Sequence, residues 1–334
     1  MRRRPIALAL VVLAASAVAA CEPTVDDPPA PALSPTPVAS DAVGLAATRV
    51  TAGGYHTCAL DGDGAATCWG LGDYGQLGSA GTDSATAPVD VAMPDGVAFA
   101  ELAAGNAHTC ALGTDGSVWC WGIDGDGIHD AQANDAHGPR RVRFPEDVVA
   151  TSLDGAYHDC VVADDGAAWC WGRDTEGQLG DGSTADSVAP VRVRTPDGVA
   201  FARVATGAFH TCALATDGSV WCWGQDLHGQ LGDGGDAGDR PTPGPIAAPD
   251  GATFVAVTAG FNHTCALAGD GAAWCWGEGV SGQLGDGGLV DATAPTPVAM
   301  PDGVAFVAID AGNAHTCALA TDGSVWCWGL GVQG

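Results

Sequence analysis

Histidine and cysteine recur together along this 334-residue chain, in a spacing that suits either metal binding or disulfide formation. A His is followed two residues later by a Cys, and a second Cys stands ten residues beyond the first. Imidazole and thiolate groups are ligands for zinc, so a zinc site in each copy is conceivable. Cysteines in an exported chain are oxidised, and an even set then favours six disulfides. The expected pairs are Cys58 with Cys68, Cys110 with Cys120, Cys160 with Cys170, Cys212 with Cys222, Cys265 with Cys275, and Cys317 with Cys327.

The six histidines form a second candidate set, because a ring of imidazoles can bind a metal or an anion. Each stands at the start of an expected strand, where its nitrogens can satisfy backbone groups within its own repeat. Equivalent positions around a ring also lie too far apart to share one ion. We therefore expect a structural role for His56, His108, His158, His210, His263 and His315.

The richest cluster of oxygen and imidazole groups lies between residues 123 and 142, and it contains Asp124, Asp126, Asp130, Asp135, His129 and His137. Its acidic residues fit several positions of a calcium-binding loop, but His129 stands where that loop needs Gly. The alternative is a solvated polar loop. The sequence thus offers calcium as the only cofactor candidate, at residues that also qualify for ligand contact.

No set of residues with catalytic spacing emerges from the sequence. The GxSxG, HExxH and GxxxxGK motifs are missing, and the acidic residues of the repeats fall in turns. Residues that repeat with the fold explain structure better than chemistry, since an active site breaks symmetry. We expect no enzymatic activity.

The elements that position these residues follow from a repeat of about fifty residues, which is typical of a propeller or a solenoid. In each copy an Asp-Gly pair midway between the cysteines predicts a hairpin turn. A strand such as 98–102 precedes the hairpin, and a proline-flanked strand such as 190–194 follows it at an edge. Four strands per repeat predict an all-β fold, a β-propeller of six four-stranded blades. An incomplete seven-bladed ring is the alternative.

The tryptophans support this arrangement. Along residues 117–121, Trp119 and Trp121 share one face of a strand and Cys120 takes the other, so both faces are apolar. A blade between two neighbours requires this pattern. We therefore expect the tryptophans to pack between blades rather than to stack on a ligand or absorb light.

The N-terminal sequence predicts where the protein is located in the cell. Residues 1–21 combine three arginines, an apolar run and Ala-Ala-Cys, which indicates a bacterial lipoprotein signal with Cys21 as the lipidated residue. Residues 22–33 suit a disordered tether, and residues 34–334 a single propeller domain. Residues 34–39 match residues 294–299 almost identically, so we expect them to supply the outer strand of the last blade. The protein is then anchored in the bacterial cell envelope, outside the cytoplasm.

Charge limits the partners. After the signal is removed, nine arginines stand against 40 acidic residues, a net charge of −31, and the chain has no lysine. Nucleic acids and anionic lipid surfaces need a basic patch, so neither is expected as a partner. Contact with the membrane is expected only through the lipid anchor.

The motif GxxHTCALxxDGxxWCWG, followed in four copies by GQLG, resembles the regulator of chromosome condensation repeat. The resemblance covers roughly residues 45–334 and implies a β-propeller, usually of seven blades, whereas six hairpins are present here. It does not carry over nucleotide exchange, which belongs to a nuclear member with a basic tail. Light-sensing members have Trp in a GWRHT motif, and the corresponding residues here are Gly54, Asn106, Ala156, Ala208, Phe261 and Asn313.

These observations predict a monomeric binding scaffold for a protein or an envelope component. An envelope hydrolase or lyase and a structural surface component are the alternatives. Loops on a rigid scaffold vary without disturbing the core, so the binding surface is expected on the loops after each Trp-Gly. These loops are 71–87, 123–139, 173–189, 225–244 and 278–294.

Overall fold

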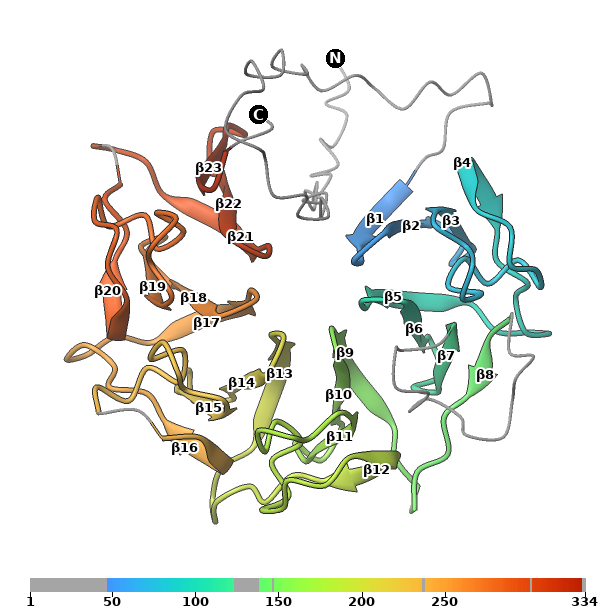
Figure 1. Ribbon diagram of the computed structural model, residues 1–334, viewed down its shortest axis with the longest axis horizontal. Helices are drawn as coiled ribbons and strands as arrows, with labels where there is room; N and C mark the ends of the chain where they lie inside the picture. The colour runs from blue at the N-terminus through green and yellow to red at the C-terminus, as the bar shows by residue number, and fades with distance from the viewer. Residues whose placement is uncertain (1–46, 123–137, 146, 236–237, 301, 332–334) are drawn as a thin grey trace, which may run out of the picture.

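The computed structural model describes residues 47–122, 138–145, 147–235, 238–300 and 302–331, which form six antiparallel sheets arranged as a ring that is open between the sixth sheet and the first (Figure 1). Each sheet is a blade in which strands that are consecutive in sequence lie side by side. The first strand of each blade lies nearest the axis, and the fourth lies at the rim (Figure 1). The predicted all-β propeller with six blades is therefore confirmed.

The first three blades contain strands β1 to β12. Blade one consists of β1 (Ala47–Ala52), β2 (His56–Asp61), β3 (Ala66–Gly70) and β4 (Ala85–Asp90). Blade two consists of β5 (Phe99–Ala104), β6 (His108–Gly113), β7 (Val118–Gly122) and β8 (Arg140–Arg141). Blade three consists of β9 (Ala150–Gly155), β10 (His158–Ala163), β11 (Ala168–Gly172) and β12 (Ser187–Arg192).

The last three blades contain strands β13 to β23. Blade four consists of β13 (Phe201–Thr206), β14 (His210–Ala215), β15 (Val220–Gly224) and β16 (Arg240–Pro245). Blade five consists of β17 (Phe254–Ala259), β18 (His263–Ala268), β19 (Ala273–Gly277) and β20 (Ala292–Pro297). Blade six has three strands among the described residues: β21 (Phe306–Ala311), β22 (His315–Ala320) and β23 (Val325–Gly329).

The cysteine hairpins form as predicted. In each blade the two cysteines are directly opposed, as Cys212 and Cys222 are between β14 and β15. All six pairs are disulfide-bonded with Cα atoms 4.1 Å apart, so the zinc alternative is wrong for these thiols. The turn is held by its Asp: in blade four, Asp217 Oδ1 accepts hydrogen bonds from the backbone N–H and the hydroxyl of Ser219. Gly218 has a φ of 85°, which favours glycine at this position.

The outer strands lie at the rim, where the proline-rich sequence predicted an edge. β12 begins at Ser187, three residues before the predicted strand, because a register shift between Cys170 and Gly172 brings Ser187 opposite Gly172. Pro190 is tolerated there because an edge strand has one side free of ladder hydrogen bonds.

The hydrophobic core is divided among the interfaces between blades, as the tryptophan pattern predicted. In one such cluster, Leu179 and Val193 of blade three pack with Phe201 and Trp223 of blade four, and all four are buried. The rings of Phe201 and Trp223 lie 6.0 Å apart. The second Trp of the hairpins in blades two to five is therefore a core residue.

The sixth blade is less covered than the others. Val325 and Trp326 of β23 are 45% and 37% exposed, whereas Val220 of the equivalent strand β15 is 1% exposed. The segment 34–39, predicted to cover β23, lies outside the described residues, as do residues 1–33 with the signal and Cys21. Among the described residues, the structure contains no helix long and apolar enough to cross a membrane.

Candidate functional site

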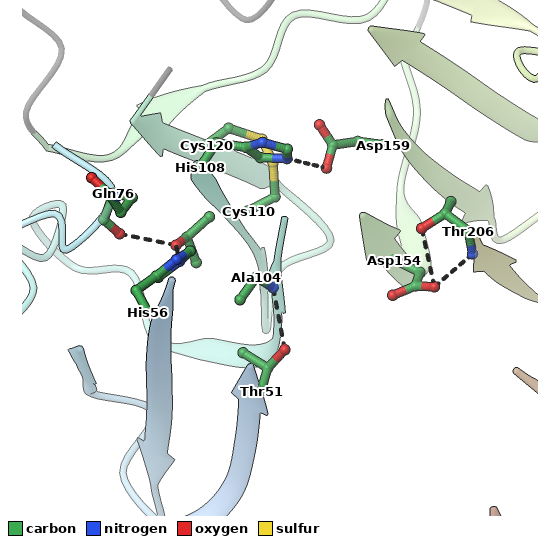
Figure 2. Close-up of polar contacts among 11 residues, drawn as sticks. Thr51, His56, Gln76, Ala104, His108, Cys110, Cys120, Asp154, Asp159 and Thr206 are labelled. Atoms are coloured by element: carbon green, nitrogen blue, oxygen red, sulfur yellow. Dashed lines mark hydrogen bonds and ion pairs between the residues drawn. A yellow bond between two sulfur atoms is a disulfide. The ribbon is translucent and has the colours of Figure 1, made fainter. Parts of the chain in front are cut away.

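The histidines join neighbouring blades, which corrects the expectation that they bond within their own blade. His56 Nε2 of blade one lies 2.7 Å from the hydroxyl of Thr109 in blade two, and that hydroxyl donates to the backbone carbonyl of Gln76 in blade one (Figure 2). Because the hydroxyl has a single proton, His56 Nε2 must be the donor to Thr109. Sequence symmetry indicated a structural role correctly but could not show which blade supplies the partner.

The same contact recurs at three further interfaces. The bonded pairs are His158 with Thr211, His210 with Thr264, and His263 with Thr316. Burial lowers the pKa of His56, His210 and His263 to about 3 and that of His158 to about 4, so these rings are neutral at pH 7. His315, in the described part of blade six, makes no such bond.

The GQLG motif is a clasp on the next blade. The Gln178 carbonyl accepts hydrogen bonds from Thr211 and from the indole of Trp223, both in blade four. Leu179 is fully buried, and Gly180 has a φ of 73° directly beside the Trp223 ring. The motif is thus explained by packing, and its side chains are unavailable for ligand binding.

One interface departs from this pattern. In blade three the Thr of the motif is replaced by Asp159, and His108 Nε2 of blade two lies 3.0 Å from its carboxylate (Figure 2). Both side chains are fully buried. Phe144 packs edge-on against Trp171 at 6.0 Å, on the Trp that GQLG would otherwise contact. His108, Asp159 and Cys110 lie close enough to hold a metal, but Cys110 has no free thiolate because it is disulfide-bonded.

The variable loops share one face of the propeller. In an up-and-down blade, the connection between the first two strands and the connection between the last two leave on the same side. Backbone hydrogen bonds join them: Leu71 N–H donates to the Tyr55 carbonyl, and Gln225 N–H to that of Phe209. We call this side the loop face, and the opposite side, which carries the Asp-Gly turns, the turn face.

The loop face exposes apolar side chains in the loops between the third and fourth strands. These side chains are 48–73% exposed and comprise Tyr74, Leu227, Val280, Leu289 and Val290. The turn face also exposes apolar side chains, at Val149, Val255 and Val307, but the loop face has more of them. Such exposed apolar groups are typical of surfaces that bind other proteins.

An aromatic cluster lies on the same face near the axis. The ring of Tyr157 is 5.7 Å from that of Phe209 and nearly parallel to it, and Phe261 lies edge-on to both. The guanidinium of Arg173, the first residue of a variable loop, stands 5.1 Å above the Phe209 ring. The three rings, which we call the mouth cluster, are half-buried.

The axis contains a cavity of about 610 Å³ lined by the innermost strands and the short loops that follow them. Tyr157 and Phe261 line it, and so do Asp154, Thr206 and Asp310. Asp154 Oδ2 accepts hydrogen bonds from the N–H and the hydroxyl of Thr206 at 2.7 and 3.2 Å, while its other oxygen points away from Thr206 (Figure 2). Burial raises the pKa of Asp154 to about 7.

Two arginines and one acid lie further along the same strands. Glu101 of β5 is 3.4 Å from Arg49 of β1 and 3.9 Å from Arg203 of β13, and it also accepts the N–H of Leu153. Burial raises the pKa of Glu101, and the two arginines counteract part of that effect. Glu101 is therefore occupied by contacts between blades.

The sequence missed the mouth cluster and Asp154. Tyr157 and Phe209 stand directly before the repeated His, and this position is aromatic in blades one, three and four but Ala or Asn elsewhere. That variation inside a constant motif was the available signal. Asp124, Asp126, Asp130, Asp135, His129 and His137, the candidates for calcium or ligand contact, lie outside the described residues. Their role stays a prediction.

Comparison with known proteins agrees with the fold and places the chain in a family. Residues 22–334 match the RCC1-like domain, so the chain belongs to the RCC1-like domain family, the regulator of chromosome condensation repeat family that the motif resembled. The described structure is similar to yeast RCC1 (Prp20) bound to Kap60, with a TM-score of 0.75 and 24% identity over 84% of this chain and 69% of that chain. Human WBSCR16 gives a TM-score of 0.73, also at 24% identity, over 81% of this chain and 71% of that chain.

Among curated relatives, the ultraviolet-B receptor UVR8 of Arabidopsis thaliana is 31% identical over 85% of this chain and 65% of the receptor. The human E3 ubiquitin-protein ligase HERC2 is 30% identical over 84% of this chain, which spans 6% of the ligase. This chain therefore corresponds to less than two thirds of either relative. Relatives of these kinds are mainly binding or regulatory proteins, although the family includes ligases.

Proposed function

We propose that this protein is an exported, lipid-anchored scaffold that binds a protein or another component of the bacterial cell envelope through its loop face. The observation that supports this most is the concentration of exposed apolar loop residues and of the mouth cluster on one face of a disulfide-bonded ring. The structure of yeast RCC1 with Kap60 is a precedent for protein binding by this fold.

The proposed localisation in the cell envelope rests on the sequence alone. The lipoprotein signal with Cys21, the tether at 22–33 and six cysteine pairs all suit an exported chain. The strong negative charge favours a protein partner with basic groups over a nucleic acid.

We further propose that binding occurs without catalysis. A hydrolase or lyase would draw on Asp154, since a carboxyl with a pKa of about 7 suits general acid-base chemistry. Glu101, which also lines the cavity, is held by two arginines. Among the described residues, the cavity is lined by one serine, the buried Ser152, by one histidine, His315, and by no cysteine. The second acid of the cavity, Asp310, and Asp154 each accept a hydrogen bond from a Thr of a neighbouring strand, Thr258 and Thr206, and two carboxyls held in this way fit a binding role better.

The test is capture from solubilised cell envelope with two matched variants. Leu227→Ser with Val280→Ser removes exposed apolar groups from the loop face, and Val255→Ser with Val307→Ser removes similar groups at the turn-face ends of β17 and β21. We expect the first variant to lose the partner recovered by the parent and the second to retain it. Equal recovery by both variants, or loss only in the second, would contradict the proposal.

A further inference from the structure

The axial cavity is layered by residue type. The loops at its mouth carry Tyr157 and Phe261, the fifth residues of β9 and β21 are Asp154 and Asp310, and the third residues of β1, β5 and β13 are Arg49, Glu101 and Arg203. Strands rise about 3.3 Å per residue, so the carboxylates lie roughly 10 Å from the mouth and about 7 Å above the arginines. A group that enters from the loop face meets aromatic rings first and carboxylates next.

The mouth is suited to a cation on an apolar stem. Aromatic faces attract ammonium and guanidinium groups, and the Arg173 guanidinium already lies over Phe209. Phe261 and Tyr157, which line the cavity, are edge-on to each other and leave ring surface toward the axis. The rings interrupt the repeat, because the residues of blade two equivalent to Tyr157 and Phe261 are Ala107 and Asn106.

Below the aromatic rings, Asp154 is the hydrogen-bond acceptor that a cationic group entering the cavity would meet. Both bonds from Thr206 fall on Oδ2, and the carboxyl is half-buried and in contact with the cavity. Asp310, across the cavity on β21, adds a second negative charge, and its carboxylate accepts the Thr258 hydroxyl. The positive groups on the adjoining strands, Arg49 and Arg203, are paired with Glu101 and do not neutralise Asp154 directly.

We infer that the axial cavity binds the cationic end of a lysine or arginine side chain, presented by the protein partner on the loop face. The mouth cluster holds the apolar stem, and the carboxylate of Asp154 accepts the charged end, with Asp310 contributing to the negative potential. This inference rests on the proposed function and specifies the chemistry of the partner. It predicts a basic residue at the centre of the partner's contact surface.

The probe is the peptide acetyl-Gly-Gly-Lys-Gly-Gly-amide, compared with its norleucine analogue and with n-butylammonium by ligand-observed NMR. We expect the lysine peptide to bind at least about tenfold more tightly than the norleucine peptide, because only lysine carries a charge for Asp154. The lysine stays protonated, while Asp154 ionises as the pH rises through about 7. Affinity should therefore increase about tenfold from pH 6 to pH 8.

Three variants separate the contributions. Asp154→Asn should abolish both the lysine preference and its pH dependence, and Phe261→Leu should weaken the lysine peptide while the pH dependence persists. Asp90→Asn, on the exposed end of β4, is the control and should change neither. Equal binding of the two peptides, or an unchanged pH profile in Asp154→Asn, would overturn the inference.

The comparison with n-butylammonium tests whether the bound cation belongs to a protein or to a free amine. We expect n-butylammonium to bind more weakly than the lysine peptide, because it lacks the backbone that contacts the face. Tighter binding of the free amine would contradict a protein source. Failure here is distinguishable from failure of the proposed function, since the Leu227→Ser and Val280→Ser test does not alter the cavity.

Discussion

The third and fourth blades are joined differently from the second and third. Between the third and fourth, His158 bonds to Thr211, and the Gln178 carbonyl receives both Thr211 and Trp223. Between the second and third, His108 meets the Asp159 carboxylate, and Phe144 covers Trp171. The first arrangement is a chain of neutral hydrogen bonds, and the second is a buried pair of ionisable groups beside an aromatic contact.

This difference shows that the clasp is a unit whose parts change together. Thr211 of blade four donates to the carbonyl of Gln178, which belongs to the GQLG sequence of blade three. Blade two has no GQLG sequence, so a Thr at position 159 of blade three would have no equivalent carbonyl to which it could donate. Asp159 needs no acceptor, because an ionised carboxylate only accepts hydrogen bonds. The segment 123–142 is the one between complete repeats that lacks GQLG, and its sequence is rich in acidic and histidine residues.

Acidification should affect the regular interfaces most. The folded pKa values of His56, His158, His210 and His263 lie at about 3 to 4, below the unfolded value near 6.5, so unfolding takes up protons. Stability is fully present above about pH 6.5 and falls as the pH decreases toward 4. Urea midpoints measured between pH 7.5 and 4.5 should decrease steadily. Asp154, Asp174 and Asp310 act in the opposite sense, since burial raises their pKa values to about 7, 6 and 6, so they offset part of this loss as the pH falls, but the four histidines outnumber them. A flat profile would mean that the histidines are not buried as neutral rings.

Asp159→Ala should destabilise the irregular interface by about 3–5 kcal/mol, because it leaves the fully buried His108 without its carboxylate partner. Urea denaturation of the variant and parent measures the loss. Asp159→Thr is the matched control, since it restores the residue found at the other interfaces. It should recover only part of the loss, because the new hydroxyl at position 159 can accept from His108 but lacks the GQLG carbonyl to which it would donate, and full recovery would show that the Thr does not depend on GQLG.

Phe144→Ala should destabilise the same interface by about 2–3 kcal/mol, less than a fully buried Phe would, because Phe144 is half-buried. The near-ultraviolet circular dichroism of Trp169 and Trp171 should also change, since both rings lose their edge-on neighbour. Phe144→Leu retains most of the apolar contact and should cost about half as much. No change in either measurement would remove Phe144 from the account of this interface.

Thr211→Val should destabilise a regular interface by about 1–2 kcal/mol, the smallest of these effects. The valine is nearly the same shape but leaves His158 Nε2 and the Gln178 carbonyl with one partner fewer. Thr206→Val, which removes a single longer bond to Asp154, is a control of the same chemistry and should cost less. A larger loss in Thr206→Val would place the stabilising contact at the axis instead of between β10 and β14.

The hairpins, disulfides and blade order were predictable because they follow from short spacings. Ten residues between cysteines and a central Asp-Gly determine the register of Cys212 and Cys222 without any knowledge of the ring. The partner of each histidine was not predictable, because identical repeats do not reveal whether His158 faces its own blade or the next. The contact joins residues 53 positions apart.

The mouth cluster was also beyond prediction, for a different reason. Tyr157, Phe209 and Phe261 come from three blades, and only the curvature of the ring brings their rings within 6.3 Å. Asp154 was hidden because its strand position is Thr or Ala in four of the six blades. Substitutions at constant positions of a repeat thus indicate where such a chain departs from pure packing.

Site-specific photo-crosslinking in the native envelope tests the central claim, that the loop face binds a protein, most directly. A photoreactive phenylalanine analogue replaces Tyr157 on the loop face in one variant and Asp115 in a turn on the turn face in another. We predict a discrete crosslinked adduct with a second protein from position 157 and none from position 115. An adduct from position 115 alone, or none from either position, would contradict the account.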